Sequence, residues 1–215
     1  MSESVRGLYE KTGVAATYRE ARVVAVEPSD GMVSARETQP DRVTFVRGVG
    51  EALPIRSQAA DVVLMSMAYH QLRDVDAAAG EMRRVLRAGG LTLLRTPTHE
   101  TLREFAWTRF FPESLAIDLA RMPSRATVEG VFTRAGFRLR DHAIVRQRIA
   151  ADLAEYASRI RSRAFSSMQL MPDDVWQRRL AEFEAYCRSA PDQPVDEPVN
   201  LFVFEAPADG APRRT

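Results

Sequence analysis

Two residues in the first third of the chain have the type and the position to do chemistry, Glu27 and His70. Glu27 follows the short apolar run 23–26, which predicts a buried parallel strand. A carboxylate at the end of such a strand lies at the carboxyl edge of a sheet, where open α/β sheets bind their ligands. His70 follows a second apolar run, 61–65, and an imidazole of ordinary pKa is suited to general base catalysis near neutrality. A packing or hydrogen-bonding role for His70 remains open.

The elements that must position these residues alternate between strands and helices. Short β-branched or apolar runs predict strands, and amphipathic segments with capping residues predict helices between them. We expect strands at 22–26, 43–46, 61–65 and 91–94, and helices at 13–21, at 30–37 and from the cap Asp74 to Gly89-Gly90. This alternation predicts an α/β, Rossmann-like fold with a doubly wound, mostly parallel sheet.

The second half of the chain changes in character and is predicted to add a helical cap. An aromatic-rich helical stretch covers 99–122, and further helices are expected after Ser124 and within 150–190. Strands are expected at 137–145 and 199–204, followed by a disordered tail over 206–215. We therefore expect one domain over 1–205, with 99–122 and 150–190 as its cap.

Composition excludes several classes of protein. The chain has 215 residues and a net charge of +1, which gives no basic surface for nucleic acid. Cys187 is the only cysteine, and the three histidines are far apart in the sequence, so no metal site is expected. No apolar run reaches the length of a membrane span and no signal peptide is recognisable, so we expect a cytoplasmic protein without a membrane partner.

Five segments at characteristic spacing resemble the class I S-adenosylmethionine (SAM)-dependent methyltransferases, in particular the ubiquinone/menaquinone-biosynthesis-like branch that acts on small molecules. The segments are VVAVEPSDGM (23–32), GVGEALP (48–54), ADVVL (60–64), AYHQLRD (68–74) and EMRRVLRAGGLTLL (81–94). The resemblance implies an enzyme that uses SAM as cofactor and transfers its methyl group to a small-molecule acceptor.

The resemblance also implies roles for individual residues. Glu27, followed by Pro28, would bind the ribose hydroxyls of the cofactor with two charge-assisted hydrogen bonds. Met32 would lie against the adenine or belong to the core, and both alternatives stay open. The segment Gly50-Glu51-Ala52 would line the adenine edge; Val49 stands where many relatives have an aspartate, so Glu51 or backbone must replace that contact. Ser66 to His70 would lie beside the methionine end of the cofactor and the acceptor.

The N-terminus departs from the family pattern. A strand followed by a glycine-rich loop is expected there, but residues 5–13 retain only Thr12-Gly13 of it, so Gly13 is the remaining loop candidate and the first strand is short or missing. Three explanations stay open: a start site further upstream, a natural short form completed by another chain, or lost cofactor binding. A short central strand favours a homodimer, because unsatisfied sheet edges pair with other strands.

The same gap leaves an alternative function open. A pseudoenzyme or a partner-binding subunit with a methyltransferase-like body would share the segments above while lacking SAM binding. The preferred interpretation is a methyltransferase, because methyl transfer depends largely on holding donor and acceptor in line and needs no obligatory catalytic side chain.

Overall fold

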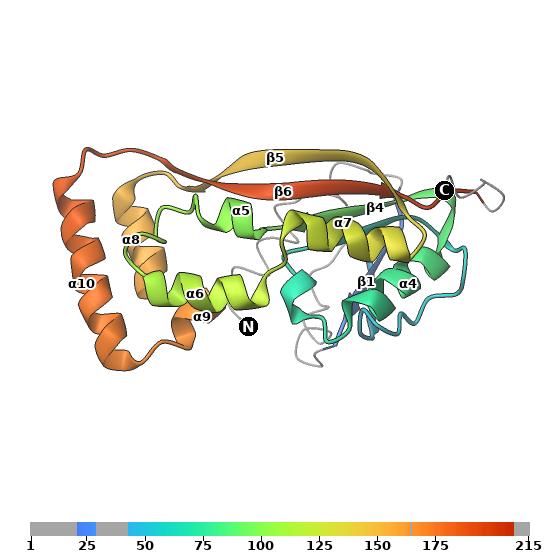
Figure 1. The fold of residues 1–215 in the computed structure, drawn as a ribbon, viewed down its shortest axis with the longest axis horizontal. Coiled ribbons are helices and arrows are strands. Elements are labelled where there is room, and N and C mark those ends of the chain that lie inside the picture. Colours follow the sequence, from blue (N-terminus) through green and yellow to red (C-terminus); the bar gives the residue numbers. More distant parts are fainter. Residues whose placement is uncertain (1–20, 29–42, 164, 209–215) are drawn as a thin grey trace.

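The computed structural model describes residues 21–28, 43–163 and 165–208 (Figure 1). Strands and helices alternate in the first half, and the second half adds helices and two long strands. In chain order the elements are β1 Val23–Glu27, β2 Val43–Arg47, β3 Ala60–Ser66, the 3-10 turn η2 Tyr69–Gln71, α4 Val75–Val85, β4 Leu86–Thr96, α5 His99–Leu102, α6 Pro112–Arg121, α7 Arg125–Arg134, β5 Arg138–Ala150, α8 Leu153–Arg161, α9 Ser166–Gln169, α10 Asp173–Ser189 and β6 Val195–Glu205.

The described strands form two sheets. β1 and β2 pair in parallel, with Glu27 opposite Arg47, and the second sheet has the order β3-β4-β6-β5. β3 and β4 are parallel, whereas β6 runs antiparallel to both β4 and β5. The predicted α/β, Rossmann-like fold is confirmed, and the strands of the first half, β1 to β4, pair in parallel as expected.

Helices α4 and α7 cover one face of the larger sheet. Apolar side chains of both helices pack in one cluster with Met65, Leu94, Phe202 and Phe204 of the strands. On the other face of β3, the side chains of Val62 and Leu64 are 52% and 44% exposed. The helices expected at 13–21 and 30–37 lie almost entirely outside the described residues, so the doubly wound arrangement is visible on one face only.

Helix α4 begins where the sequence predicts and ends earlier. The carboxylate of Asp74 accepts a hydrogen bond from the Ala77 amide at 2.9 Å, which satisfies a free N–H of the first turn. Gly89 has the expected positive φ of +76°, but the helix stops at Val85. The loop before β3 ends it, because the amides of residues 58 and 59 donate to the last-turn carbonyls of residues 84 and 85. The chain is extended from Leu86 onward and continues as β4.

The aromatic stretch 99–122 is wrong as a continuous helix. It contains the short α5 and the longer α6, joined by turns over 103–111. The Thr108 hydroxyl donates to the Phe105 carbonyl at 2.8 Å within these turns. Pro112 then starts α6 at a position where its missing N–H costs no hydrogen bond. The turns let Trp107 and Phe111, both 0% exposed, reach the core from different directions.

The remaining predicted elements are confirmed, with longer strands. Ser124 caps α7 through the Thr127 amide at 3.1 Å, and α8 and α10 occupy the expected segments. The short α9 was not predicted. β5 and β6 extend well beyond 137–145 and 199–204 because they pair with each other along almost their whole length.

A second hydrophobic cluster holds the helical end of the molecule, which lies opposite α4 and β1 in Figure 1. Side chains of the 102–111 turns, α8 and α10 form it, together with Ala150 of β5 and Val195 of β6. Strand β6 thus belongs to both clusters, since Phe202 and Phe204 pack beneath α4 and α7. None of the described helices combines the length and the apolar character needed to cross a bilayer.

Candidate functional site

Glu27 lies at the carboxyl end of β1, as the sequence predicts. Its backbone carbonyl accepts a hydrogen bond from the Gly48 amide at 3.2 Å, which ties the end of β1 to the segment after β2. Pro28 follows and is exposed. The other two proposed cofactor residues of this region, Gly13 and Met32, lie outside the described residues.

The segment after β2 packs against the loop that follows β3. The Ala52 amide donates to the Val49 carbonyl at 3.2 Å and forms a tight turn. A Cβ added at Gly50 would lie 2.6 Å from Leu72 Cδ2, so a larger residue would require the Leu72 side chain to move. Gly50 therefore lies next to Leu72, two residues after His70, and Gly48 links the turn to Glu27.

Glu51 makes contacts that the sequence did not predict. Its carboxylate accepts hydrogen bonds from the backbone amides of Arg73 at 2.7 Å and Asp74 at 3.3 Å. Burial alone would raise its pKa, but these backbone hydrogen bonds outweigh burial, and the pKa lies below its usual value. The carboxylate thus holds the loop that enters α4, and that contact competes with any role at an adenine edge.

Ser66 ends β3 and takes part in a polar network that was missed by sequence reasoning. Its Oγ accepts a hydrogen bond from Arg95 Nη1 at 2.9 Å, and Arg95 Nη2 donates to Gln147 Oε1 of β5. The sequence did contain one signal for this network: Arg95, a cation, directly follows the predicted strand Leu91-Thr92-Leu93-Leu94.

His70 lies in the 3-10 turn η2, just beyond the end of β3. Its Nδ1 is buried and has no hydrogen-bond partner among the residues that the structure describes. Burial, together with the positive charge of Arg121, lowers the pKa of the His70 imidazole. The ring is therefore neutral at neutral pH, the state in which a histidine can accept a proton. Met67, in the same loop, has a φ of +56°.

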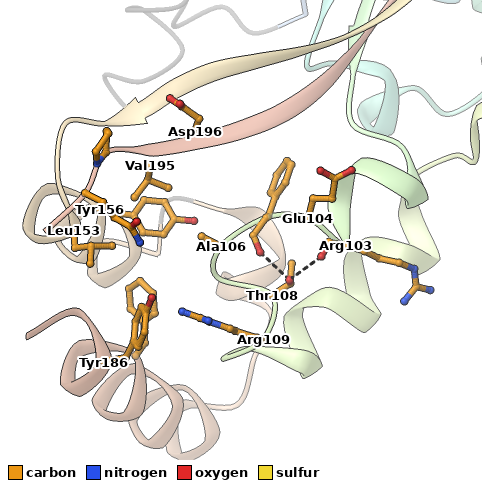
Figure 2. Close-up of a pocket in the computed structure, with 14 residues that line it drawn as sticks. Arg103, Glu104, Ala106, Thr108, Arg109, Leu153, Tyr156, Tyr186, Val195 and Asp196 are labelled. Carbon is orange, nitrogen blue, oxygen red and sulfur yellow. Dashed lines mark hydrogen bonds between the residues drawn. The ribbon is translucent and has the colours of Figure 1, made fainter. Parts of the chain in front are cut away.

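A pocket of about 450 Å³ lies at the other end of the molecule, between the 103–109 turns, α8, α10 and the start of β6 (Figure 2). Its aromatic walls include Phe105, Tyr156 and Tyr186. The Tyr156 hydroxyl donates to the buried Glu197 carboxylate at 2.6 Å. The Arg109 guanidinium lies 4.1 Å from the centre of the Tyr186 ring, a cation–π contact.

The pocket and the proposed cofactor residues do not coincide. No proposed site residue lines the pocket. Arg95 is paired with Leu201 of β6, whereas Asp196 of the same strand lines the pocket, and five strand residues span roughly 17 Å. Glu27 and Ser66 end β1 and β3, and His70 lies just beyond β3, whereas the pocket is a separate feature of the helical end.

Comparison with known proteins agrees with the architecture. Residues 9–94 match the family described as methyltransferase domain. The malonyl-[acyl-carrier protein] O-methyltransferase of Methylovorus sp. is 28% identical over 141 residues, which are 60% of this chain and 46% of the relative. The ubiquinone/menaquinone biosynthesis C-methyltransferase UbiE of Shewanella frigidimarina is 26% identical over 146 residues, 56% of this chain and 58% of the relative. The chain thus spans about half the length of these relatives.

Solved structures show the same fold. A protein of Anabaena variabilis, assigned to the methyltransferases of an antibiotic biosynthesis pathway, superposes with a TM-score of 0.69 at 20% identity, covering 90% of this chain and 85% of that one. The [4+2]-cyclase SpnF superposes with a TM-score of 0.57 at 19% identity, covering 92% of this chain and 72% of that one. Sequence and fold thus agree: residues 9–94 are similar to the methyltransferase domain, and the architecture is the one seen in solved methyltransferase structures.

Proposed function

We propose that this protein transfers the methyl group of SAM to a small-molecule acceptor at the carboxyl edge of its sheet. The observation that carries the proposal is that the 48–52 turn contacts both Glu27, through the Gly48 amide, and Leu72, two residues after the Ser66–His70 loop. These segments are far apart in sequence, and open α/β sheets bind ligands where such strand ends meet.

The described residues fit the parts of a nucleoside donor. Glu27 would accept hydrogen bonds from the two ribose hydroxyls. Gly50 and Ala52 would offer backbone groups to the adenine edge, while Glu51 supports them by holding residues 73 and 74. Pro28, Met32 and Gly13 complete the proposed set from the sequence resemblance.

The chemistry that bound SAM supplies is a sulfonium methyl group open to in-line attack. The contribution of the protein is to hold the acceptor nucleophile opposite that methyl and to exclude water. His70 would take the proton of the nucleophile through Nδ1, which is buried and unpartnered among described residues, in the neutral tautomer that carries its hydrogen on Nε2.

The segments 99–122 and 150–190 would form a cap that selects the acceptor. The packing of both segments in one hydrophobic cluster supports such a cap. A small-molecule acceptor is also supported by the relative UbiE, whose name places it in ubiquinone/menaquinone biosynthesis. A cytoplasmic location without a nucleic-acid partner belongs to the same proposal. So does a homodimer, for which the exposed apolar side chains of β3 are the supporting feature.

Calorimetry with S-adenosylhomocysteine tests the proposal on the full chain. The wild-type protein should bind it, and Glu27→Ala should weaken binding about 10- to 100-fold, because two charge-assisted hydrogen bonds are lost. Asp174→Ala, which removes an exposed acid at the start of α10, is the matched control and should bind as the wild type does. Absence of binding by folded wild-type protein at millimolar ligand would reject the proposal.

A further inference from the structure

Arg95 is a half-buried arginine at the carboxyl edge of the larger sheet. It lies opposite Ser66 in the parallel β3–β4 register. Its Nη1 donates to Ser66 Oγ at 2.9 Å, and its Nη2 donates to Gln147 Oε1. This network reaches from β3 to β5 beside the residues proposed to hold the cofactor.

The charge of Arg95 is not balanced by a carboxylate in the part of the chain that the structure describes. Both of its side-chain partners are neutral. Other arginines on β4 and β5 do pair with acids: Arg87 with Asp61, Arg138 with Glu205, Arg146 with Glu104 and Arg148 with Asp196. Burial lowers the pKa of the Arg95 guanidinium, yet arginine stays protonated at neutral pH. Holding such a cation away from water is unfavourable, and a bound anion would offset that cost.

The free donors of the network match a carboxylate. The guanidinium presents five N–H groups in a planar fork, and only two of them are used by Ser66 and Gln147. The remaining ones allow the bidentate geometry that arginine forms with carboxylates. The Gln147 amide nitrogen and the Ser66 hydroxyl proton are further donors beside it.

The backbone next to Arg95 belongs to the proposed acceptor loop. The Arg95 carbonyl accepts a hydrogen bond from the Met67 amide at 2.8 Å, and Met67 has a φ of +56°. Left-handed backbone at a non-glycine residue is uncommon and concentrates at functional turns. His70 follows three residues later in the same loop.

We propose that Arg95 binds the carboxylate of a small molecule at this edge, with Ser66 and Gln147 orienting the guanidinium. The inference rests on the proposed function, which supplies two sources of this chemistry. One source is the amino-acid end of SAM. The other is an acceptor that is itself a carboxylic acid.

Two matched pairs of ligands separate these sources by calorimetry. S-adenosylhomocysteine carries the amino-acid carboxylate, and 5′-methylthioadenosine has the same nucleoside without it. Benzoate and benzamide, titrated into protein saturated with S-adenosylhomocysteine, differ in charge and little in shape. The variants are Arg95→Gln and the control Arg87→Gln, which removes an exposed arginine of the same strand.

If Arg95 binds the cofactor, Arg95→Gln should weaken the binding of S-adenosylhomocysteine about 10- to 100-fold and leave the binding of 5′-methylthioadenosine unchanged. If Arg95 binds the acceptor, the variant should bind S-adenosylhomocysteine as the wild type does, and its dissociation constant for benzoate should rise by a similar factor. The inference is overturned if Arg95→Gln binds both carboxylates as the wild type does, or if the wild type binds neither. Wild-type protein that binds benzoate through Arg95 but neither nucleoside would instead refute only the proposed function.

Thermal unfolding distinguishes binding from a structural role. Removing a half-buried cation without a counter-charge should leave the Tm of Arg95→Gln equal to or above that of the wild type. A fall in Tm of more than about 5 °C, accompanied by weaker binding of 5′-methylthioadenosine as well, would assign Arg95 to folding and overturn the inference.

Discussion

At the scale of single residues, the environment of a titratable group decides what it can do. His70 and Glu197 are both shielded from water, yet burial moves their pKa values in opposite directions because it disfavours the charged form of each. The imidazole is thereby kept neutral near the carboxyl edge. The pKa of the Glu197 carboxyl, beside Tyr156 at the helical end, is raised to about 7, so about half of it is protonated at neutral pH.

For His70 we expect a pKa below 6.5, the ordinary value, because burial and then Arg121 disfavour its cation. Histidine NMR titration of the full chain should show this directly. Arg121→Gln should raise the pKa of His70. Arg125 pairs with Glu129 on the surface, so Arg125→Gln should leave the pKa of His70 unchanged. A wild-type His70 that titrates above 6.5 would contradict the structure around it.

For Glu197 we expect a pH-dependent stability. Burial raises its pKa to about 7 from 4.5, although the hydrogen bond from Tyr156 and the charge of Arg159 act in the opposite direction. The folded state therefore favours the protonated carboxyl, and this contribution is complete below pH 4.5 and lost as the pH rises through 7. The loss amounts to about 3 kcal/mol.

Glu197→Gln should remove that dependence and unfold at higher urea than the wild type at pH 8, since the amide accepts the Tyr156 hydrogen bond without charge. Asp196→Asn, the neighbour that pairs with Arg148, is the control and should keep the wild-type profile. Urea denaturation at pH 4.5, 6 and 8 provides the measurement. An unchanged profile in Glu197→Gln would show that another group causes the dependence.

At the scale of elements, helix α10 is attached to the molecule by aromatic contacts. Phe183, 1% exposed, has ring centroids of Phe110, Phe111 and Tyr156 within 5.2, 5.7 and 5.8 Å. These partners come from the 103–111 turns and from α8. The interruption of the predicted helix 99–122 is thus what allows its aromatic side chains to surround α10.

Phe183→Ala should reduce the free energy of unfolding by about 3–5 kcal/mol, because a large cavity replaces the ring. Leu170→Ala, at a side chain 62% exposed, should change it by less than about 0.5 kcal/mol. Urea denaturation followed by circular dichroism measures both. Equal effects of the two substitutions would mean that α10 does not pack as described.

At the scale of the whole molecule, strands β5 and β6 join two hydrophobic clusters along their length (Figure 1). The sheet cluster lies beneath α4 and α7, and the helical cluster surrounds α8 and α10. Strand β3 borders the sheet cluster with one face only. Its neighbouring residues Leu64 and Met65 are 44% and 8% exposed, so they report on the two faces of the same strand.

In the monomer, Met65→Ala should therefore cost about 2–5 kcal/mol of stability, and Leu64→Ala less than about 1 kcal/mol. Both substitutions remove a similar apolar volume from one strand, so each serves as the control of the other. The comparison is made by urea denaturation of the isolated full chain. A Leu64→Ala cost as large as that of Met65→Ala would show that this face is covered in solution, as the proposed homodimer requires.

The order of the elements and the strand ends that carry the proposed site could be predicted from local patterns in the chain. Local signals suffice for these, because apolar periodicity and caps such as Asp74 and Ser124 act over a few residues. The same local signals placed Glu27, Ser66 and His70 at the ends of their strands or just beyond them.

The contacts of those side chains could not be predicted from local patterns, because they depend on how distant segments fold together. The Glu51 carboxylate binds amides some 22 residues away, Arg95 faces Ser66 and Gln147 in place of an acid, and Pro112 together with the 103–111 turns divides a stretch that looked continuous. Hydrogen bonds and charge pairs between distant segments depend on how strands pair and helices pack. That information is not contained in the pattern of any single segment.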